Sequence, residues 1–263
     1  FYGDPSAALR MIGVTGTNGK TTTTYVVKTM LEAANRQVGL IGTVAYLVGK
    51  ESIPASHTTP GALELQKLFA RMVEKRLDTV VMEVSSHALA LDRTAGAEFD
   101  VAVFTNLTQD HLDYHGTMEK YFEAKVKLFQ VAADTPRASL IINGDDLWGR
   151  KLIERFASTG RVIKYGFSVG NDFRANNVRY DMTGTQFELD AKGRSFLVRT
   201  PLIGDFNVSN ALGAAAAAWA LGVPTDHLAQ RLSTLPQVPG RLERIVERPC
   251  VLRDYAHKPD ALE

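Results

Sequence analysis

The sequence has one cysteine, no long apolar run and almost no net charge. Cys250 alone cannot form an intrachain disulfide or a cysteine-based zinc site, which fits a reducing cytoplasm. The most apolar stretch, residues 211–223, contains two glycines and is shorter than the roughly 18 residues that a membrane span needs, and the first residues lack a signal-peptide pattern. A net charge of +1 gives no basic field for nucleic acid or an anionic membrane. We expect a cytoplasmic protein that binds neither nucleic acid nor a membrane. Any anion that it binds must be held by a local site.

The remaining composition is that of an ordinary globular domain. Of the 263 residues, 45% are hydrophobic and 22% are charged. This length is enough for one large domain or about one and a half. The sequence opens on Phe1, and residues 259–263 resemble the first turn of a helix. We therefore expect a piece of a longer protein.

Short apolar runs alternate with helical patterns through the first two-thirds of the chain, which predicts a mostly parallel sheet. Apolar residues at helical spacing follow Thr59 and Pro60, a suitable N-cap and N1 pair, and predict a helix over the sheet. A second helix is predicted at about residues 117–130. The predicted buried strands are residues 11–14, 38–41, 79–84, 101–104 and 140–142.

The pattern changes in the last third of the chain. Alternating residues from 173 to 199, broken at 183–184 and 192–193, predict an antiparallel meander attached to the parallel core. Residues 207–221 predict a helix of small residues. Prolines 236 and 239 and Gly240 resemble a linker, after which two short apolar pairs begin another domain. The predicted fold class is α/β, a mostly parallel sheet flanked by helices with a smaller antiparallel β-meander.

Residues 13–22 read GVTGTNGKTT, directly after a predicted strand and at the start of a helix, the context that a phosphate loop requires. Glycines let backbone N–H groups wrap phosphates, Lys20 neutralises their charge, and the Thr21 hydroxyl can ligate Mg²⁺. Val14 stands where the strict motif has its first glycine, and the alternative is a glycine turn with a solvated lysine. The candidate nucleotide-binding residues are Gly16, Thr17, Asn18, Gly19, Lys20, Thr21 and Thr22.

Three further residues are candidates for chemistry at this edge of the sheet. Glu83 ends a central strand, where a carboxylate can hold Mg²⁺, although it could also cap a helix or form an ion pair. His111 follows the next strand, and the alternative is a packed or hydrogen-bonded histidine. Lys125 stands on an apolar stripe of its helix. It either extends to water or stays buried, where an uncharged amine can add CO₂ to become a carbamate.

Several short motifs, taken in their order along the chain, resemble those of a known enzyme family. The loop GTNGKTT resembles those of the Mur ligases and folylpolyglutamate synthetases, and the combination resembles the MurE type, which adds the third amino acid of the peptidoglycan stem. The resemblance covers the whole chain and implies the family's central ATP-binding domain at residues 1–237, with 238–263 as a linker and the start of a C-terminal Rossmann-like domain. The other stretches are residues 57–60 (HTTP), 83–87 (EVSSH), 105–107 (TNL), 110–116 (DHLDYHG), 121–125 (YFEAK), 240–243 (GRLE) and 254–257 (DYAH).

The resemblance also implies roles for individual residues. It assigns His111 to a second Mg²⁺ and makes Lys125 a carbamylated lysine beside it. The implied metal ligands are Thr21, Glu83, His111 and Lys125. The implied catalytic residues are Lys20, Glu83, His111 and Lys125. Leu91 departs from relatives with a polar substrate contact there. Capping remains the alternative role for the threonine pair and for the two asparagines. The implied substrate residues are Thr58, Thr59, Ser85 and Arg93, and the implied nucleotide contacts are Asn207, Asn210, Arg241 and Asp254.

The implied activity is ATP- and Mg²⁺-dependent amide bond formation by a monomer. It would join a diamino acid, meso-diaminopimelate or L-lysine, to UDP-N-acetylmuramoyl-L-alanyl-D-glutamate through an acyl phosphate. One alternative is a folylpolyglutamate synthetase, which shares the loop but lacks the HTTP and EVSSHAL segments. The other is a P-loop module that binds ATP without ligation.

Overall fold

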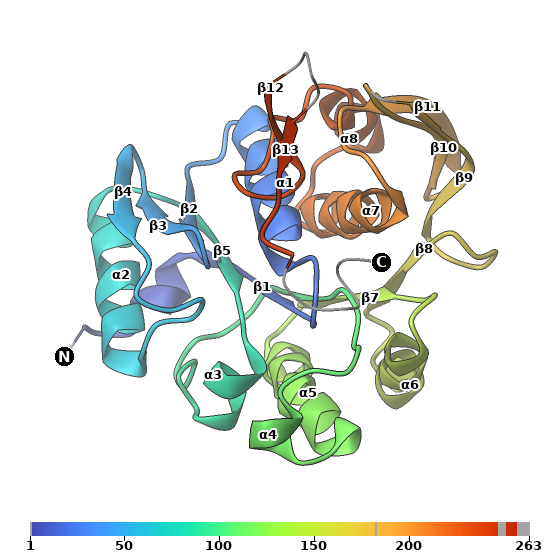
Figure 1. The fold of residues 1–263 in the computed structure, drawn as a ribbon. Helices are drawn as coiled ribbons and strands as arrows, with labels where there is room; N and C mark the ends of the chain where they lie inside the picture. The colour runs from blue at the N-terminus through green and yellow to red at the C-terminus, as the bar shows by residue number, and fades with distance from the viewer. Residues whose placement is uncertain (1, 182, 247–250, 257–263) are drawn as a thin grey trace.

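The computed structural model describes residues 2–181, 183–246 and 251–256. The expected helix turn at 259–263 and His257 of the last motif lie outside them. Eleven strands form one sheet in the order β11-β10-β9-β8-β7-β6-β1-β5-β2-β3-β4 (Figure 1). The strands are β1 (Arg10–Thr15), β2 (Val38–Ile41), β3 (Ala45–Val48), β4 (Glu51–Pro54), β5 (Thr79–Glu83), β6 (Val101–Phe104), β7 (Ser139–Asn143), β8 (Val162–Gly166), β9 (Phe173–Asp181), β10 (Gly184–Ala191) and β11 (Arg194–Thr200).

The central strands confirm the predicted parallel core. Strands β1, β2, β5, β6, β7 and β8 run parallel to one another, and each predicted run falls on one of them. Their side chains are buried on both faces of the sheet, which is why the sequence shows continuous apolar runs rather than alternation. The carboxyl ends of β1, β5 and β6 therefore meet at one edge.

Helices cover both faces of the sheet and create two cores. One core lies between the sheet and α1, α7 and α8, and the other lies under α2, α5 and α6, as Figure 1 shows. The helices are α1 (Lys20–Ala33), α2 (Ala62–Glu74), α3 (Ser86–Ala90), α4 (Leu112–His115), α5 (Met118–Asp134), α6 (Leu147–Phe156), α7 (Asp205–Ala220) and α8 (Thr225–Leu232), with 3-10 turns at Pro5–Ala8 and Ala157–Thr159. No helix of the described residues has the length and apolar character needed to cross a bilayer.

The predicted meander is confirmed, and it extends the main sheet. β9, β10 and β11 pair antiparallel, and β9 joins the core by pairing parallel to β8. The small-residue helix α7 packs on the face of the sheet that α1 and α8 also cover. A side chain at Gly213 would overlap the ring of Tyr165 in β8. The alanines at positions 211 and 214–218 of α7 are fully buried, so their small size allows the close approach to α1 and the sheet.

Two helix boundaries differ from the expectation. Helix α2 begins at Ala62 with Gly61 as its N-cap, so the predicted capping role of Thr59 and Pro60 is wrong. The Thr59 hydroxyl instead donates to the carbonyl of Glu83 and accepts from a backbone N–H. Helix α5 does start after Thr117, whose hydroxyl accepts from the N–H of Lys120, but it continues to Asp134 because apolar residues keep packing on the sheet.

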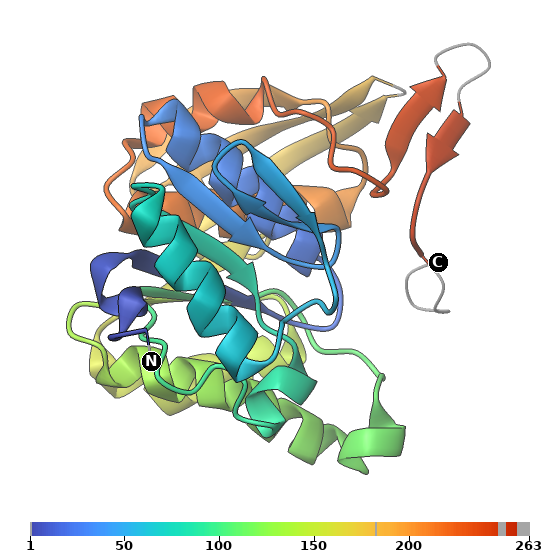
Figure 2. The ribbon, with the colours of Figure 1, turned by 90° about the vertical axis from the view of Figure 1, so that its left-hand side faces the viewer.

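The segment after the linker forms a separate small sheet. Strands β12 (Glu243–Val246) and β13 (Val251–Arg253) pair antiparallel with each other and make no ladder with the eleven-stranded sheet. Figure 2 shows the pair projecting from the main body. The predicted strand pairs at 245–246 and 251–252 therefore lie in strands of their own.

Candidate active site

The loop between β1 and α1 lies at the carboxyl edge of the parallel sheet and is shaped by two glycines. Gly16 and Gly19 have φ angles of +151° and +85°, a region that side chains avoid. A Cβ at Gly16 would overlap the hydroxyl of Thr105, and one at Gly19 would overlap the side-chain oxygen of Asn210. The loop backbone is therefore packed tightly against β6 and α7, as a phosphate cradle requires.

The end of β6 supports this loop through hydrogen bonds. The N–H of Thr17 donates to the carbonyl of Asn106 (2.9 Å), and the N–H of Asn18 donates to the side-chain oxygen of Asn106 (2.9 Å). The Thr105 hydroxyl donates to the carbonyl of Asn18 (2.6 Å). These contacts fix the loop before any ligand binds.

Lys20 opens helix α1 and lies folded over the loop. Its Nζ donates to the carbonyls of Gly16 and Thr17, both at 2.8 Å, and the residue is half-buried. The side chain thus bonds to the loop instead of extending freely into solvent. Among the described residues, no side chain caps α1 at Gly19. Because the first N–H groups of a helix have no partner within the helix, the loop and the first turn of α1 together suit an anion.

Glu83 is buried at the end of β5, with 1% of its surface exposed. One carboxylate oxygen accepts from the N–H of Thr43 (2.9 Å), and the other accepts from the Thr43 hydroxyl (3.0 Å). That hydroxyl also lies 3.0 Å from the hydroxyl of Thr58. Glu83 caps no described helix and forms no ion pair with a described residue, so both alternative roles are wrong.

His111 lies at the surface rather than packed inside. Its side chain is 40% exposed, and its Nε2 is 3.1 Å from a carboxylate oxygen of Asp110, which holds the ring in place. The backbone at His111 has a φ of +52°. Its ring meets the ring of Tyr121 edge-on at 5.9 Å. His111 is therefore a hydrogen-bonded histidine in this structure, as the alternative expected.

Lys125 is buried on α5, with 2% of its surface exposed, so the alternative of a side chain extending to water is wrong. Its Nζ donates to the carbonyl of Gly16 (3.0 Å) and lies 4.5 Å from the centroid of the Tyr121 ring. Lys20 donates to the same carbonyl. Two lysine side chains therefore meet at one oxygen of the phosphate loop, one of them buried.

The four predicted substrate residues gather beside Glu83. Thr59 accepts from the N–H of Ser85 (3.0 Å), and a guanidinium nitrogen of Arg93 donates to the carbonyl of Thr59 (3.2 Å). Ser85 also caps α3, where its hydroxyl accepts from a backbone N–H at 3.2 Å. Thr58 reaches Glu83 through Thr43. Leu91, which departs from the family pattern, is 53% exposed at the end of α3.

Two of the four predicted nucleotide contacts from the second half of the chain touch the loop or the first turn of α1, and the other two have other partners. Asn210 packs against Gly19, and Arg241 donates to the Thr21 hydroxyl (3.1 Å). The side chain of Asn207 donates to the carbonyl of Ile203 (3.0 Å) and caps no helix, so the capping alternative is wrong for it. Asp254 accepts from backbone N–H groups of its own segment.

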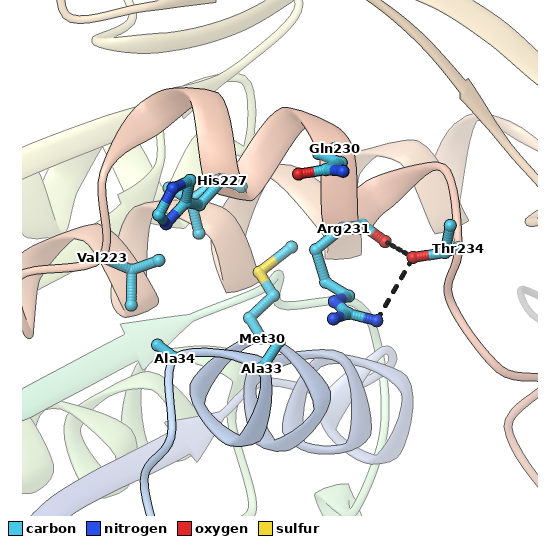
Figure 3. Close-up of a pocket in the computed structure, with 9 residues that line it drawn as sticks. Met30, Ala33, Ala34, Val223, His227, Gln230, Arg231 and Thr234 are labelled. Atoms are coloured by element: carbon cyan, nitrogen blue, oxygen red, sulfur yellow. Dashed lines mark hydrogen bonds between the residues drawn. The ribbon is translucent and has the colours of Figure 1, made fainter.

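Cavities among the described residues also lie outside the loop itself. One of about 360 Å³ lies between the end of α1 and α8, lined by Met30, Val223 and Arg231 among others (Figure 3). It is at the end of α1 opposite the phosphate loop, so it is not part of this site. A crevice of about 60 Å³ beside Asn207 and Arg241 is close to the loop.

The site includes residues that the sequence did not single out. Thr43 holds both oxygens of Glu83, and Tyr121 places its hydroxyl 3.2 Å from the hydroxyl of Thr17. Thr43 lies just past the end of β2, at the same edge as the loop, and that position was the available signal. Tyr121 was visible only as a neighbour of Lys125 in the YFEAK segment.

The described residues fit Mg²⁺ bound together with a phosphate. They contain no group of three or more histidine, cysteine, aspartate or glutamate side chains that would hold a metal ion by themselves. Mg²⁺ usually takes one or two carboxylates and completes its shell with waters and substrate phosphates. The buried carboxylate of Glu83 and the hydroxyl of Thr21 at the start of α1 are suitable oxygen donors of this kind.

A glycine-shaped loop between strand and helix, a lysine folded over it and a carboxylate on the adjacent strand define a P-loop α/β domain. The chain belongs to the Mur ligase family, because the model of the Mur ligase middle domain matches residues 14–218. It is 46% identical over 266 residues to a UDP-N-acetylmuramoyl-L-alanyl-D-glutamate–2,6-diaminopimelate ligase from Synechococcus elongatus, covering 100% of this chain and 53% of that protein. The chain thus spans about half the length of the curated relatives it matches.

Solved structures agree with this family. A structure of a UDP-N-acetylmuramoyl-L-alanyl-D-glutamate–2,6-diaminopimelate ligase has a TM-score of 0.85 and 33% identity, covering 97% of this chain and 52% of that one. A complex described as FPGS-AMPPCP-folate has a TM-score of 0.76 and 20% identity, covering 99% of this chain and 71% of that one. The second likeness shows a shared fold.

Proposed function

We propose that the whole protein is an ATP-dependent ligase that joins 2,6-diaminopimelate to UDP-N-acetylmuramoyl-L-alanyl-D-glutamate, in the cytoplasm and as a monomer. The observation that carries this proposal is that Lys20 and Lys125 donate to one carbonyl of the phosphate loop, while Glu83 lies opposite Val14, at the end of the strand next to β1. The names of the relatives support the substrates, and their diaminopimelate favours that amino acid over L-lysine. The alternative of a folylpolyglutamate synthetase is supported only by a shared fold.

The proposed reaction has two steps. A carboxylate oxygen of the D-glutamyl residue attacks the γ-phosphorus of ATP, which breaks the bond to the β-phosphate oxygen and gives an acyl phosphate and ADP. The uncharged amine of the diamino acid then attacks the acyl carbon, the C–O bond to phosphate breaks, and the amine loses a proton. The products are the amide, ADP and inorganic phosphate. Because several anions meet in this reaction, positioning and charge neutralisation do most of the catalytic work.

The residues of the phosphate loop bind and orient the nucleotide in this proposal. Lys20 exchanges its bonds with the loop carbonyls for contacts to the phosphates, and the N–H groups of Gly19 and the first turn of α1 donate to them. Mg²⁺, held by Thr21 and Glu83 and at a second position by His111 and Lys125, would offset the phosphate charge. Asn207, Asn210, Arg241 and Asp254 would contact the rest of the nucleotide, beside the crevice at Asn207.

Thr58, Thr59, Ser85 and Arg93 form the proposed substrate side. Arg93 already donates to the backbone at Thr59, so its guanidinium is oriented along the site. A guanidinium suits a carboxylate or phosphate because its N–H groups form a planar fork. We propose that residues 1–237 form the central ATP-binding domain and that 238–263 are a linker and the start of a C-terminal Rossmann-like domain. The separate β12–β13 sheet supports this boundary.

Lys125 is proposed to carry a carbamate. The uncharged amine adds CO₂ and releases a proton, giving R–NH–COO⁻, which is an anionic oxygen ligand. Nζ of Lys125 is buried, and it shares the Gly16 carbonyl with Nζ of Lys20, so a carbamate there would lie beside a cationic side chain. The carbamate nitrogen keeps one N–H, so the hydrogen bond to Gly16 survives the modification.

Product formation by the full-length protein tests the proposed function. With ATP, Mg²⁺ and the muramoyl dipeptide, release of ADP should depend on the added amino acid and should be strongest with diaminopimelate. L-lysine and glutamate serve as comparison amino acids. ADP release at the same rate with and without the dipeptide and the amino acid would instead support a P-loop module without ligase activity.

The 263-residue chain alone is expected to bind nucleotide but not to turn over. In the family that the chain belongs to, a third domain closes over ATP, and closure completes such sites. Nucleotide titration and an assay for the amide product on the isolated chain and the full-length protein check this. Substrate-dependent amide formation by the isolated chain at the full-length rate would overturn the expectation.

Thr43→Val should weaken Mg²⁺ binding by the full-length protein with little loss of folding stability. The change removes the hydroxyl that donates to Glu83 and leaves the backbone N–H bond in place, so the carboxylate loses part of its orientation. We expect a rise of about three- to tenfold in the Mg²⁺ concentration for half-maximal activity. This is less than the roughly ten- to 150-fold that the full 1.5–3 kcal/mol of a hydrogen bond to a charged group would give, because the carboxylate and its bond to the backbone N–H remain. Thr43→Ser, which keeps the hydroxyl, is the matched control and should retain the wild-type Mg²⁺ dependence.

A further inference from the structure

The side chain of Tyr121 contacts three parts of the candidate site at once. It projects from α5 and is 1% exposed. Its hydroxyl lies 3.2 Å from the Thr17 hydroxyl in the phosphate loop, and its ring centroid lies 4.5 Å from Nζ of Lys125. The ring of His111 meets it edge-on at 5.9 Å. The roles proposed above do not use Tyr121, although it touches the loop and two of the proposed metal ligands.

The hydroxyl of Thr17 joins Tyr121 to a further segment of the site. It lies 3.3 Å from the carbonyl of Thr108 and accepts from the N–H of Thr108 (3.0 Å). Either hydroxyl can be the donor in the contact between Tyr121 and Thr17, and in both cases the hydrogen bond ties α5 to the phosphate loop.

The ring of Tyr121 is fixed by its neighbours. The ring of His115 stacks on it, with centroids 5.1 Å apart and an angle of 29° between the planes. His115 is itself held, because its Nε2 lies 3.0 Å from the hydroxyl of Ser86. With its hydroxyl bound to Thr17, the ring cannot turn away from Lys125. It therefore covers one side of Nζ, while the carbonyl of Gly16 occupies another.

We propose that Tyr121 is a positioning residue that couples the phosphate loop to Lys125 and His111. Its hydroxyl holds the loop at Thr17 in the shape that binds nucleotide. Its ring excludes water from Nζ of Lys125, which slows the return of a carbamate to amine and CO₂, a step that consumes one proton. The second part rests on the proposed function through the carbamate, whereas the first concerns nucleotide binding alone.

Tyr121→Phe in the full-length protein separates the hydroxyl from the ring. It should weaken Mg²⁺-ATP binding by about three- to tenfold, the effect of one lost hydrogen bond, since Thr17 keeps its bonds to Thr108. A carbamate signal from ¹³C-labelled bicarbonate should remain, because the ring still covers Nζ. Tyr114→Phe is the matched control: Tyr114 is 46% exposed, and the described residues give its hydroxyl no hydrogen bond. Its nucleotide affinity should equal that of the wild type.

Tyr121→Leu removes the ring as well, and it should lose the ¹³C carbamate signal in addition to the nucleotide affinity. If this variant does not fold, the comparison of Tyr121→Phe with Tyr114→Phe still decides the role of the hydroxyl. Wild-type nucleotide affinity in Tyr121→Phe would overturn the coupling to the loop. A full carbamate signal in folded Tyr121→Leu would overturn the role of the ring. Absence of ligation by the wild type would instead count against the proposed function and leave the nucleotide comparison intact.

Discussion

Replacing Lys20 with alanine is expected to reduce ATP-dependent ligation by the full-length protein by about 10³-fold or more. The Nζ of Lys20 lies at the centre of the loop, and charge stabilisation at a transferring phosphoryl group is among the largest catalytic effects known. The cost in folding should be small, at most about 2 kcal/mol, because the side chain packs in neither core and loses two hydrogen bonds to carbonyls.

Lys28→Ala is the matched control for this prediction. Lys28 stands two turns further along α1 and pairs with Glu32 on the surface, so its removal changes neither the loop nor the phosphates. Thermal melts and nucleotide titrations of both variants separate folding from function. If Lys20→Ala retained wild-type nucleotide affinity and activity, the phosphate-binding role of the loop would be refuted.

Lys125→Ala is expected to lower ligation by about 10²- to 10³-fold, through loss of the proposed anionic ligand. Addition of formate or acetate should restore part of the activity, because a small carboxylate fits the space left by the buried side chain and supplies the missing oxygen ligand. Rescue by a carboxylate is a specific sign of the carbamate, since chloride at the same ionic strength should not substitute for it.

Lys127→Ala controls for the loss of a lysine from the same helix. Lys127 is exposed, donates to the carbonyl of Leu89 and pairs with Asp92 at the surface. Neither of these partners belongs to the phosphate loop. It should retain wild-type activity and show no response to formate. A Lys125→Ala enzyme with unimpaired ligation would sink the assignment of Lys125.

The buried strands were predictable because their apolar runs are local features of the sequence. The phosphate loop was predictable for the same reason, since its glycines and Lys20 are contiguous and follow a strand. The start of α2 was not, because Thr59 is a good capping residue whose hydroxyl is used by Glu83 and Ser85, both distant in sequence. Tertiary contacts here overrode a local preference.

The residues that support the site were harder to predict. Tyr121 and Thr17 are separated by 104 residues, and Thr43 and Glu83 by 40, so no local pattern joins either pair. Their proximity follows from the strand order, in which β5 lies between β1 and β2 and β6 lies on the other side of β1. The burial of Lys125 has a similar origin, since its helical stripe allowed both an extended and a buried side chain.

The transfer of ¹⁸O from substrate to phosphate is a direct test of the acyl phosphate. With ¹⁸O in both oxygens of the reacting D-glutamyl carboxylate, attack on the γ-phosphorus places one labelled oxygen in the C–O–P bridge and leaves the other in the acyl C=O group. Attack by the amine then breaks the C–O bond, so the bridging oxygen leaves with inorganic phosphate. We predict one ¹⁸O atom in phosphate for each amide formed by the full-length protein. Amide formation that releases only unlabelled phosphate would contradict it.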